Sequence, residues 1–144
     1  MKLQHILSAK APGMFTISPT HTVKQAIDLL VENNIGSLLV VNDGGLAGII
    51  TERDILRLCS TRIAEIHTIP VGDAMTTDLI IGRPDDEVEY TMSVMTDRHI
   101  RHMPVMDGGD IAGMVSIGDL VKSQLQEGEV VIRHLKDYIT GNQR

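Results

Sequence analysis

The sequence contains few of the residues that build disulfide-rich, cysteine-metal or aromatic ligand sites. Its 144 residues include one cysteine, no tryptophan, two tyrosines and one phenylalanine. The single cysteine, Cys59, excludes an intrachain disulfide and a cysteine metal cluster. Because rings are so scarce, a planar ligand would be held between aliphatic and methionine side chains rather than stacked on aromatic ones.

Basic surfaces and long apolar runs are also lacking. The net charge is −6 and the sequence pI is about 5.4, which argues against nucleic acid and an anionic membrane surface as partners. No run approaches the roughly 20 apolar residues that a membrane span needs. The first residues do not have the apolar core of a secretion signal, so we expect a cytoplasmic protein without a membrane partner.

The motifs of common catalytic sites are missing as well. There is no Gly-x-Ser-x-Gly, no phosphate-loop Gly-x-x-x-x-Gly-Lys and no Gly-x-Gly-x-x-Gly. His99 and His102 straddle a predicted boundary between a helix and a strand and do not share one face, so we expect no metal site. No nucleophile stands with a base, and we expect the protein not to be an enzyme.

The chain repeats one unit. An apolar run ends in Thr51, with Asp54 three positions later, and the same order returns at Ser116 and Asp119. A constant offset over so long a span indicates a duplication. Other identities at this offset are Pro19/Pro84, Val23/Val88, Ile35/Ile100, Val40/Val105, Gly44/Gly109, Ala47/Ala112 and Gly48/Gly113.

Hydrophobic spacing and turn residues predict the same order of elements in each repeat. Thr22, with Gln25 three positions on, has the form of a capping box and predicts a helix start. Asn-Asp-Gly-Gly at 42–45 and Asp-Gly-Gly-Asp at 107–110 predict hairpin turns. We predict strands at 14–17, 37–41, 46–50, 79–81, 102–106 and 111–115, helices at 1–10, from 22, at 52–59, at 71–75, from 86 and at 119–125, and a linker at 60–70.

These elements predict an α+β fold. Two pseudo-symmetric β-α-β-β-α repeats would pack through their sheets, with a cleft between them. The predicted divisions are 1–65, which includes the N-terminal helix, then 66–125, then a tail at 126–144. The tail carries apolar residues at helical spacing over 127–138, has no counterpart in the repeat, and is expected to pack on a neighbour.

The duplicated pattern resembles a tandem cystathionine-β-synthase (CBS) domain pair, or Bateman module. The resemblance covers roughly residues 3–125 and rests on Thr/Ser-x-x-Asp in both repeats and on Met103-Pro104-Val105. In detail the chain is similar to stand-alone bacterial and organellar CBS pairs. The resemblance implies a homodimer that binds an adenosine-containing ligand, AMP, ADP, ATP, NAD(H) or S-adenosylmethionine, in clefts between the repeats.

The resemblance also implies which residues bind. Asp54 and Asp119 would accept the ribose hydroxyls, because a carboxylate can receive both hydroxyls of a cis-diol. By the same resemblance, the hydroxyls of Thr51 and Ser116 would contact the ribose or a phosphate. A structural alternative is that these carboxylates or hydroxyls only cap helices. The remaining candidates contact the base or phosphates by resemblance: Phe15, Ser37, Arg53, Thr76, Ile80, Ile100, Arg101, His102, Met103 and Pro104.

Three points stay open at this level. Phe15 and Ile80 are equally well explained as core residues. Arg53 either reaches a phosphate or forms an exposed ion pair with Glu52. Gly118, where the motif commonly has a bulkier residue, either makes room for a larger ligand or loosens the site.

The two clefts are not expected to be equivalent. Arg101 and His102 provide basic groups in the second repeat, where the first repeat has Gly36 and Ser37, so we expect the second-repeat site with Asp119 to bind better. The resulting hypothesis is a sensor that signals adenine-nucleotide occupancy to a protein partner still to be identified. The alternative is a scaffold for protein–protein contact that binds no nucleotide.

Overall fold

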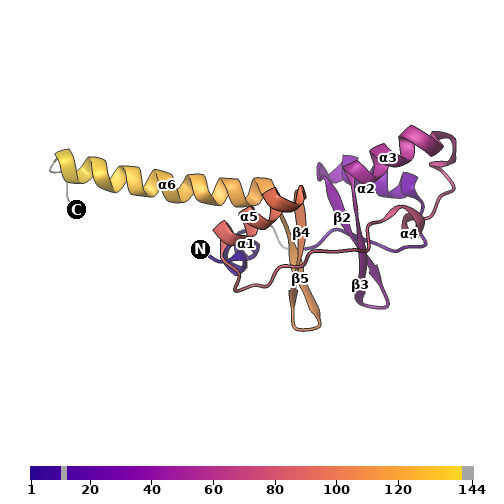
Figure 1. Cartoon of the computed structure of the whole chain (residues 1–144), viewed down its shortest axis with the longest axis horizontal. Coiled ribbons are helices and arrows are strands. Elements are labelled where there is room, and N and C mark those ends of the chain that lie inside the picture. The colour runs from indigo at the N-terminus through magenta and orange to yellow at the C-terminus, as the bar shows by residue number, and fades with distance from the viewer. Residues whose placement is uncertain (11–12, 141–144) are drawn as a thin grey trace.

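The computed structural model describes residues 1–10 and 13–140, which form two α+β halves side by side and one long projecting helix (Figure 1). The predicted fold class is confirmed. In chain order the elements are α1 (Leu3–Ala9), β1 (Thr16–Ile17), α2 (Val23–Asn33), β2 (Ser37–Asn42), β3 (Gly45–Thr51), α3 (Glu52–Arg62), the 3-10 turn η1 (Ile63–Glu65), α4 (Val71–Ala74), α5 (Val88–Arg98), β4 (His102–Asp107), β5 (Asp110–Ser116) and α6 (Ile117–Thr140).

Each half is built on a hairpin of matching register. In the first half β1 runs parallel to β2, and β2 pairs antiparallel with β3, with Ser37 opposite Thr51. In the second half β4 pairs antiparallel with β5, with His102 opposite Ser116. Asp43, at a φ of 52°, lies in the first turn, where its short polar side chain tolerates the left-handed region, as predicted from the turn residues.

One predicted strand is absent. Residues 79–81 are not a strand, and the segment makes only a single parallel bridge, between Gly82 and Val105. At Gly82 the backbone passes very close to Met103, whose Sδ would lie 3.0 Å from an added Cβ. The second sheet is therefore β4 and β5 with one bridging residue at its edge, whereas the first sheet has three strands.

The helix boundaries follow the capping signals. Thr22 caps α2: its hydroxyl accepts from the Gln25 N–H at 3.2 Å, and its own N–H donates to the Gln25 side chain at 2.9 Å. Asn34 ends α2 in the left-handed conformation, and His99 ends α5 in the same way at the matching position of the repeat. The predicted capping box is confirmed.

The division by packing differs from the division by sequence. Leu3 and Ile6 of α1 are buried in the core of the second half, and the Leu3 N–H donates to the Asp86 carbonyl at 3.0 Å. In the opposite direction, Ile66 and Ile69 are buried in the core of the first half. Each half is therefore completed by a segment that precedes the other repeat in sequence, and α1 does not pack with the 1–65 segment to which we assigned it.

The last helix is continuous. The sequence predicted a closing helix and a separate tail helix, but α6 runs unbroken from Ile117 to Thr140. Gly128 lies inside it without ending it. Only the root of α6, near Leu120 and Ser123, is buried, and Figure 1 shows the rest projecting beyond α1 and α5.

Candidate functional site: two clefts at strand-to-helix junctions

Two clefts lie where the strands of one half meet the other half. Their volumes are about 650 and 690 Å³, within the range of small-molecule sites. One is lined by Asp119 and Ser116, at the junction of β5 and α6, and the other by Asp54 and Thr51, at the junction of β3 and α3. We call them the Asp119 cleft and the Asp54 cleft.

Both aspartates close a reciprocal cap at the start of a helix. The Thr51 N–H donates to Asp54 Oδ2 at 2.9 Å, and the Asp54 N–H donates back to Thr51 Oγ1 at 3.3 Å. Ser116 and Asp119 repeat this, at 2.9 and 3.1 Å. The capping role that the sequence offered as an alternative is present, and it holds each carboxylate at the edge of its cleft.

Both carboxylate oxygens of Asp54 accept hydrogen bonds from other residues of the protein. Its Oδ1 accepts a hydrogen bond from the Thr76 hydroxyl at 2.9 Å, and the residue is 8% exposed. Thr76 is fixed in turn by two backbone hydrogen bonds with Ile49, at 2.8 and 3.0 Å. This carboxylate therefore ties the first half to the segment that leads into the second.

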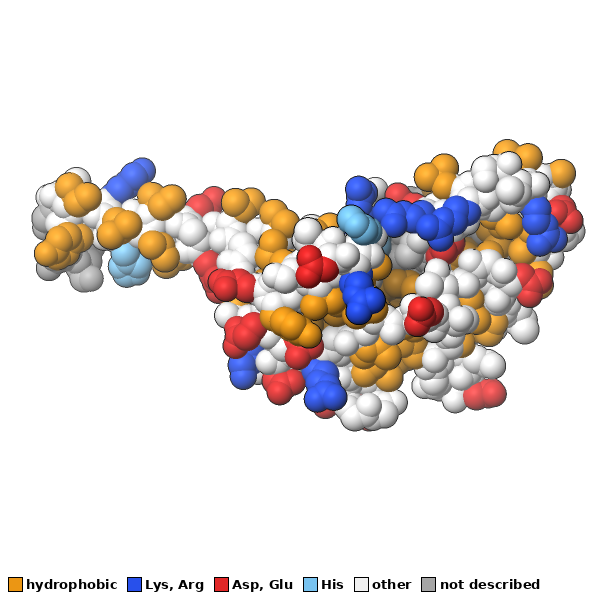
Figure 2. Space-filling view, viewed as in Figure 1, with side chains coloured by type: hydrophobic (Ala, Val, Ile, Leu, Met, Phe, Trp, Pro, Cys, Tyr) orange, Lys and Arg blue, Asp and Glu red, His pale blue; other side chains and the backbone are white. Residues whose placement is uncertain are grey.

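The Asp54 cleft is rich in arginine. Arg53 Nη1 donates to the His99 carbonyl at 3.0 Å, which joins α3 to the end of α5. Figure 2 shows Lys and Arg side chains in a row between the two halves. The arginines that line this cleft are Arg53, Arg57, Arg98 and Arg101.

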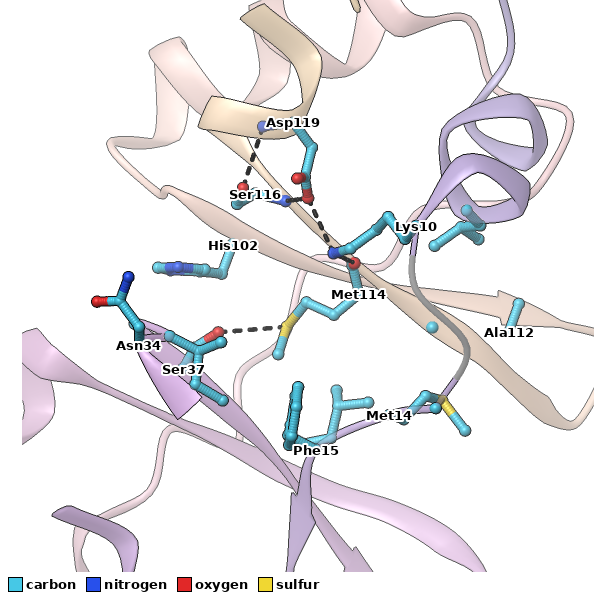
Figure 3. Close-up of a pocket in the computed structure, with 16 residues that line it drawn as sticks. Lys10, Met14, Phe15, Asn34, Ser37, His102, Ala112, Met114, Ser116 and Asp119 are labelled. Atoms are coloured by element: carbon cyan, nitrogen blue, oxygen red, sulfur yellow. Dashed lines mark hydrogen bonds and ion pairs between the residues drawn. The ribbon is translucent and has the colours of Figure 1, made fainter. Parts of the chain in front are cut away.

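Among the described residues, one lysine and no arginine line the Asp119 cleft. Lys10, at the end of α1, donates from Nζ to Asp119 Oδ2 at 2.9 Å and to the Met114 carbonyl at 2.8 Å (Figure 3). No feature of the repeat indicated Lys10, because the matching position in the other half is Met75. The contact exists because α1 packs against the second half.

Asp119 remains more accessible than Asp54. Its side chain is 27% exposed, and its Oδ1 accepts none of the hydrogen bonds found among the described residues. Partial burial works to raise the pKa of Asp119, but hydrogen bonds from the Ser116 N–H and the Lys10 ammonium outweigh it and hold the pKa below its ordinary value. Asp119 is thus an ionised acceptor with one oxygen turned to the cleft.

The opposite wall of the Asp119 cleft comes from the first half. Figure 3 shows Phe15 and Ser37 facing Ser116 and Asp119 across the opening. Phe15 is 47% exposed and lines this cleft, so it belongs to the wall of the cleft rather than to the core. Ser37 is buried, and its hydroxyl donates to Met114 Sδ at 3.7 Å.

The structure groups the predicted residues differently from the sequence. We grouped Arg101 with Asp119, and this was wrong: Arg101 lines the Asp54 cleft. Each strand end faces the other half, so an aspartate from one repeat meets the first segment of the other. The residues that join Asp54 are Thr51, Arg53, Thr76, Ile80, Ile100, Arg101 and Pro104, and those that join Asp119 are Phe15, Ser37 and Ser116, while His102 lines both.

Met103 is a second correction. It is 2% exposed, belongs to the core of the second half, and lines neither cleft. Side chains alternate along a strand, so His102 and Pro104 face the clefts while Met103 and Val105 face the core. The Met-Pro-Val segment thus carries site residues and core residues in alternation.

His102 lies between the two clefts. Burial lowers its pKa most, and the charges of Lys10 and Arg101 add to this, against the opposing effects of Glu52 and Asp119. Its Nε2 would lie 3.1 Å from a Cβ added to Gly36, so the absence of a side chain at Gly36 makes room for the imidazole. A neutral imidazole at pH 7 can both donate and accept a hydrogen bond.

Metal-binding clusters and membrane-spanning helices are both lacking in the described part of the chain. No group of three or more His, Cys, Asp or Glu side chains is placed to hold a metal ion among residues 1–10 and 13–140. Within the same residues, no helix has the length and apolarity needed to cross a membrane.

Comparison with known proteins agrees with this tandem α+β architecture. The family model described as "CBS domain" matches residues 10–61 and again 71–126. The mitochondrial CBS domain-containing protein CBSX3 of Arabidopsis thaliana is 41% identical over 125 residues, which cover 83% of this chain and 61% of that protein. YhcV of Bacillus subtilis is 34% identical over 110 residues, 76% of this chain and 78% of the relative.

Solved structures extend the likeness to three dimensions. A CBS-domain protein from Agrobacterium tumefaciens has a TM-score of 0.82 at 30% identity, covering 86% of this chain and 99% of that chain. CBSX2, solved in complex with AMP, has a TM-score of 0.74 at 25% identity, covering 88% and 98%. The CBS domain pair of MJ0100, solved with 5-methylthioadenosine and S-adenosyl-L-methionine, has a TM-score of 0.76 at 25% identity, covering 90% and 98%.

The fold and the two clefts define a tandem pair of small α+β domains. The chain belongs to the CBS-domain family. It spans 61% of the length of the Arabidopsis relative.

Proposed function

We propose that this CBS pair binds adenosine-containing ligands in its interdomain clefts and reports their presence to a protein partner. The observation that carries the proposal is the Asp119 cleft, where an ionised carboxylate faces a half-exposed phenyl ring. A carboxylate oxygen accepts ribose hydroxyls, and an apolar wall accommodates the face of a base. The complexes of CBSX2 with AMP and of MJ0100 with S-adenosylmethionine support the same ligand class.

The two clefts fit different parts of that ligand class. Asp119 is the more accessible ribose acceptor, and Lys10 is the one cation that lines its cleft among the described residues. The Asp54 cleft offers guanidinium groups, which bind phosphates bidentately. We therefore expect S-adenosylmethionine or AMP in the Asp119 cleft, and ADP, ATP or NAD(H) in the Asp54 cleft.

The protein would report that a ligand is bound through thermodynamic linkage between ligand binding and the orientation of the halves. A ligand that touches both walls of a cleft favours the relative orientation of the halves that it fits best, and so shifts the population of that orientation. Any partner surface that spans the two halves is then sensitive to occupancy. The proposed role is binding and reporting, and an assay for products after incubation with ATP tests it against nucleotide hydrolysis.

The experiment is thermal unfolding of the purified chain with AMP, ADP, ATP, NADH and S-adenosylmethionine in separate samples. A ligand at 100 times its dissociation constant adds about 2.7 kcal/mol to the free energy of unfolding, which raises the midpoint measurably. We expect a rise that is lost in Asp119→Ala for ligands of the Asp119 cleft, with Asp54→Ala affecting these ligands less. Equal loss in both variants contradicts this assignment of ligands to the clefts.

A second candidate function is a scaffold without nucleotide. The observation that favours it is that both oxygens of Asp54 are already bonded, to the Thr51 N–H and to the Thr76 hydroxyl. A ligand would have to displace or share these contacts. If no ligand changes the midpoint, the scaffold is the better account.

A further inference from the structure

The Asp119 cleft is lined by one cation and one anion, and these two side chains bind each other. Among the described residues that line it, Lys10 and Asp119 carry the charges at pH 7, because burial lowers the pKa of His102 and leaves its imidazole neutral. The other lining residues are apolar or uncharged. A charged group of a ligand in this cleft therefore interacts mainly with this lysine and this aspartate.

Lys10 keeps its position without help from Asp119. Its Nζ donates to the Met114 carbonyl at 2.8 Å as well as to Asp119 Oδ2 at 2.9 Å (Figure 3). Its backbone N–H donates to the Ile6 and Leu7 carbonyls at 3.2 and 3.3 Å, which fixes the residue at the end of α1. Because an ammonium has three N–H donors, one of them stays available to a ligand.

A ribose bound to Asp119 would lie beside this ammonium. A cis-diol that binds in bidentate fashion uses both carboxylate oxygens, and the Lys10 ammonium is 2.9 Å from one of them. A ribose is only a few ångströms across, so a group on its 5′ carbon stays within the Debye length of about 8 Å, over which charges interact at physiological ionic strength. Lys10 is therefore placed to respond to the charge of that 5′ group.

We infer that Lys10 determines the ligand specificity of the Asp119 cleft, by favouring an adenosine with an anionic 5′ group over one with a cationic 5′ group. This inference rests on the proposed function, and it separates AMP, which carries a phosphate, from S-adenosylmethionine, which carries a sulfonium. The phosphate attracts the ammonium and accepts its remaining N–H. The sulfonium is repelled by the ammonium. Without Lys10, the charge of Asp119 would favour the opposite order.

The other repeat shows that a neutral side chain fits at this position. The counterpart of Lys10 is Met75, which packs against the core of the first half and does not line the Asp54 cleft. The Lys10 side chain is 41% exposed, so replacing it opens no cavity in the core. Lys10→Met is therefore a substitution that the fold can accept, and it removes the charge alone.

The test measures affinity at the Asp119 cleft and not at the other one. Met114 lines the Asp119 cleft but not the Asp54 cleft, so the NMR signal of its methyl group, assigned with Met114→Leu, reports binding at one site. AMP, S-adenosylmethionine and uncharged adenosine are titrated separately into the full chain. We expect AMP to bind at least about tenfold more tightly than S-adenosylmethionine.

Lys10→Met should move the two charged ligands in opposite directions. The dissociation constant should rise about tenfold for AMP, fall about threefold for S-adenosylmethionine, and change less than about twofold for adenosine. Lys10→Arg, which keeps the charge, should keep AMP ahead of S-adenosylmethionine. Lys122→Met, at an exposed position that lines neither cleft, is the matched control and should change none of the three.

A purely structural role of Lys10 gives a different result. Loss of support for the Met114 carbonyl would weaken all three ligands alike. An equal change for the three ligands, or an unchanged ratio of AMP to S-adenosylmethionine affinity, would overturn the inference and leave the proposed function standing. If none of the three ligands shifts the Met114 signal, the proposed function fails at this cleft, and the specificity of Lys10 fails with it.

Discussion

The two clefts come from one duplicated unit, yet they hold their aspartates in opposite ways. Asp54 is 8% exposed and bonded through both oxygens, whereas the side chain of Asp119 is 27% exposed and shares one oxygen with Lys10. Cations are more numerous around the less exposed aspartate. Within the part of the chain that the structure describes, four arginines line the Asp54 cleft and one lysine lines the Asp119 cleft.

This difference shows how a duplication can separate two jobs. The reciprocal cap of Thr or Ser with Asp is kept in both copies, because each helix start needs it. What surrounds the cap has diverged: Thr76 closes over Asp54, and Arg101 stands where the other repeat has Gly36. Asp54 now ties two segments of the protein together beside a group of arginines, whereas one oxygen of Asp119 accepts no hydrogen bond from the described residues.

The largest expected effect is on stability, and it separates the two aspartates. Asp54→Ala leaves the Thr51 N–H and the Thr76 hydroxyl without their acceptor in a buried place, which costs about 2 to 4 kcal/mol of the free energy of unfolding. Asp119→Ala removes a cap and a solvent-screened ion pair, about 1 kcal/mol. Urea denaturation midpoints measure both.

The control for this pair is Thr76→Val. It removes the hydroxyl that reaches Asp54 without touching the cap, so it should cost less than Asp54→Ala. Equal losses for Asp54→Ala and Asp119→Ala would mean that burial does not distinguish the two carboxylates.

The next effect is on ligand affinity and rests on the proposed function. Arg101→Ala should raise the dissociation constant for ATP about tenfold, or 1.4 kcal/mol, and change that for adenosine far less, since only ATP carries phosphates for the guanidinium. Isothermal titration at two salt concentrations measures this. Lys122→Ala, which removes an exposed cation that lines neither cleft, is the matched control. A loss of equal size for adenosine would place Arg101 at the base or ribose instead.

A smaller effect concerns Lys10 and sharpens the account of the Asp119 cleft. Lys10→Met removes a hydrogen-bonded cation, so the pKa of Asp119 should rise toward its ordinary value. A carboxyl whose pKa is depressed by folding stabilises the protein above the unfolded pKa, and this stabilisation is lost as pH falls through the folded pKa. Carboxyl chemical shifts of Asp119 in an NMR titration report the change, which should be absent in the control Lys2→Met.

Stability at pH 7 should hardly follow the Lys10 substitution. The pair is partly exposed to solvent, with side chains 41% and 27% accessible, so its contribution is at most about 1 kcal/mol. A much larger loss would mean that the Met114 carbonyl depends on Lys10 as its hydrogen-bond partner.

The sequence was sufficient for most local features, although not for residues 79–81, which form no strand, or for the unbroken α6. Apolar spacing, the capping box at Thr22 and the glycine-containing turns predicted the helices and hairpins, and the repeat identified Asp54 and Asp119 as equivalent. These features depend on neighbours within a few positions, which a pattern records directly.

The grouping of the site residues failed, because it depends on which repeat each segment contacts. Lys10 reaches Asp119 because α1 packs on the far half, and Arg101 joins Asp54 because each strand end faces the other repeat. A repeat pattern shows which residues are equivalent but not which copy each will meet. The same gap explains why Met103 was taken for a site residue, since strand alternation, not motif membership, turned it to the core.

The smallest expected effect is the pH response of His102, the residue that both clefts share. Its pKa is lowered by burial, so the folded state holds the imidazole neutral in a range where the unfolded chain binds a proton. Stability should therefore rise with pH between the folded pKa and the ordinary value near 6.5, and be lost as pH falls through that window. His102→Gln should flatten the slope of the free energy of unfolding between pH 5 and 7, measured by urea titration at several pH values. His67→Gln, at an exposed position outside both clefts, is the control. Because His102 touches both clefts, a ligand in either one should shift its titration, and a shift from one cleft alone would show that the two are not coupled through this side chain.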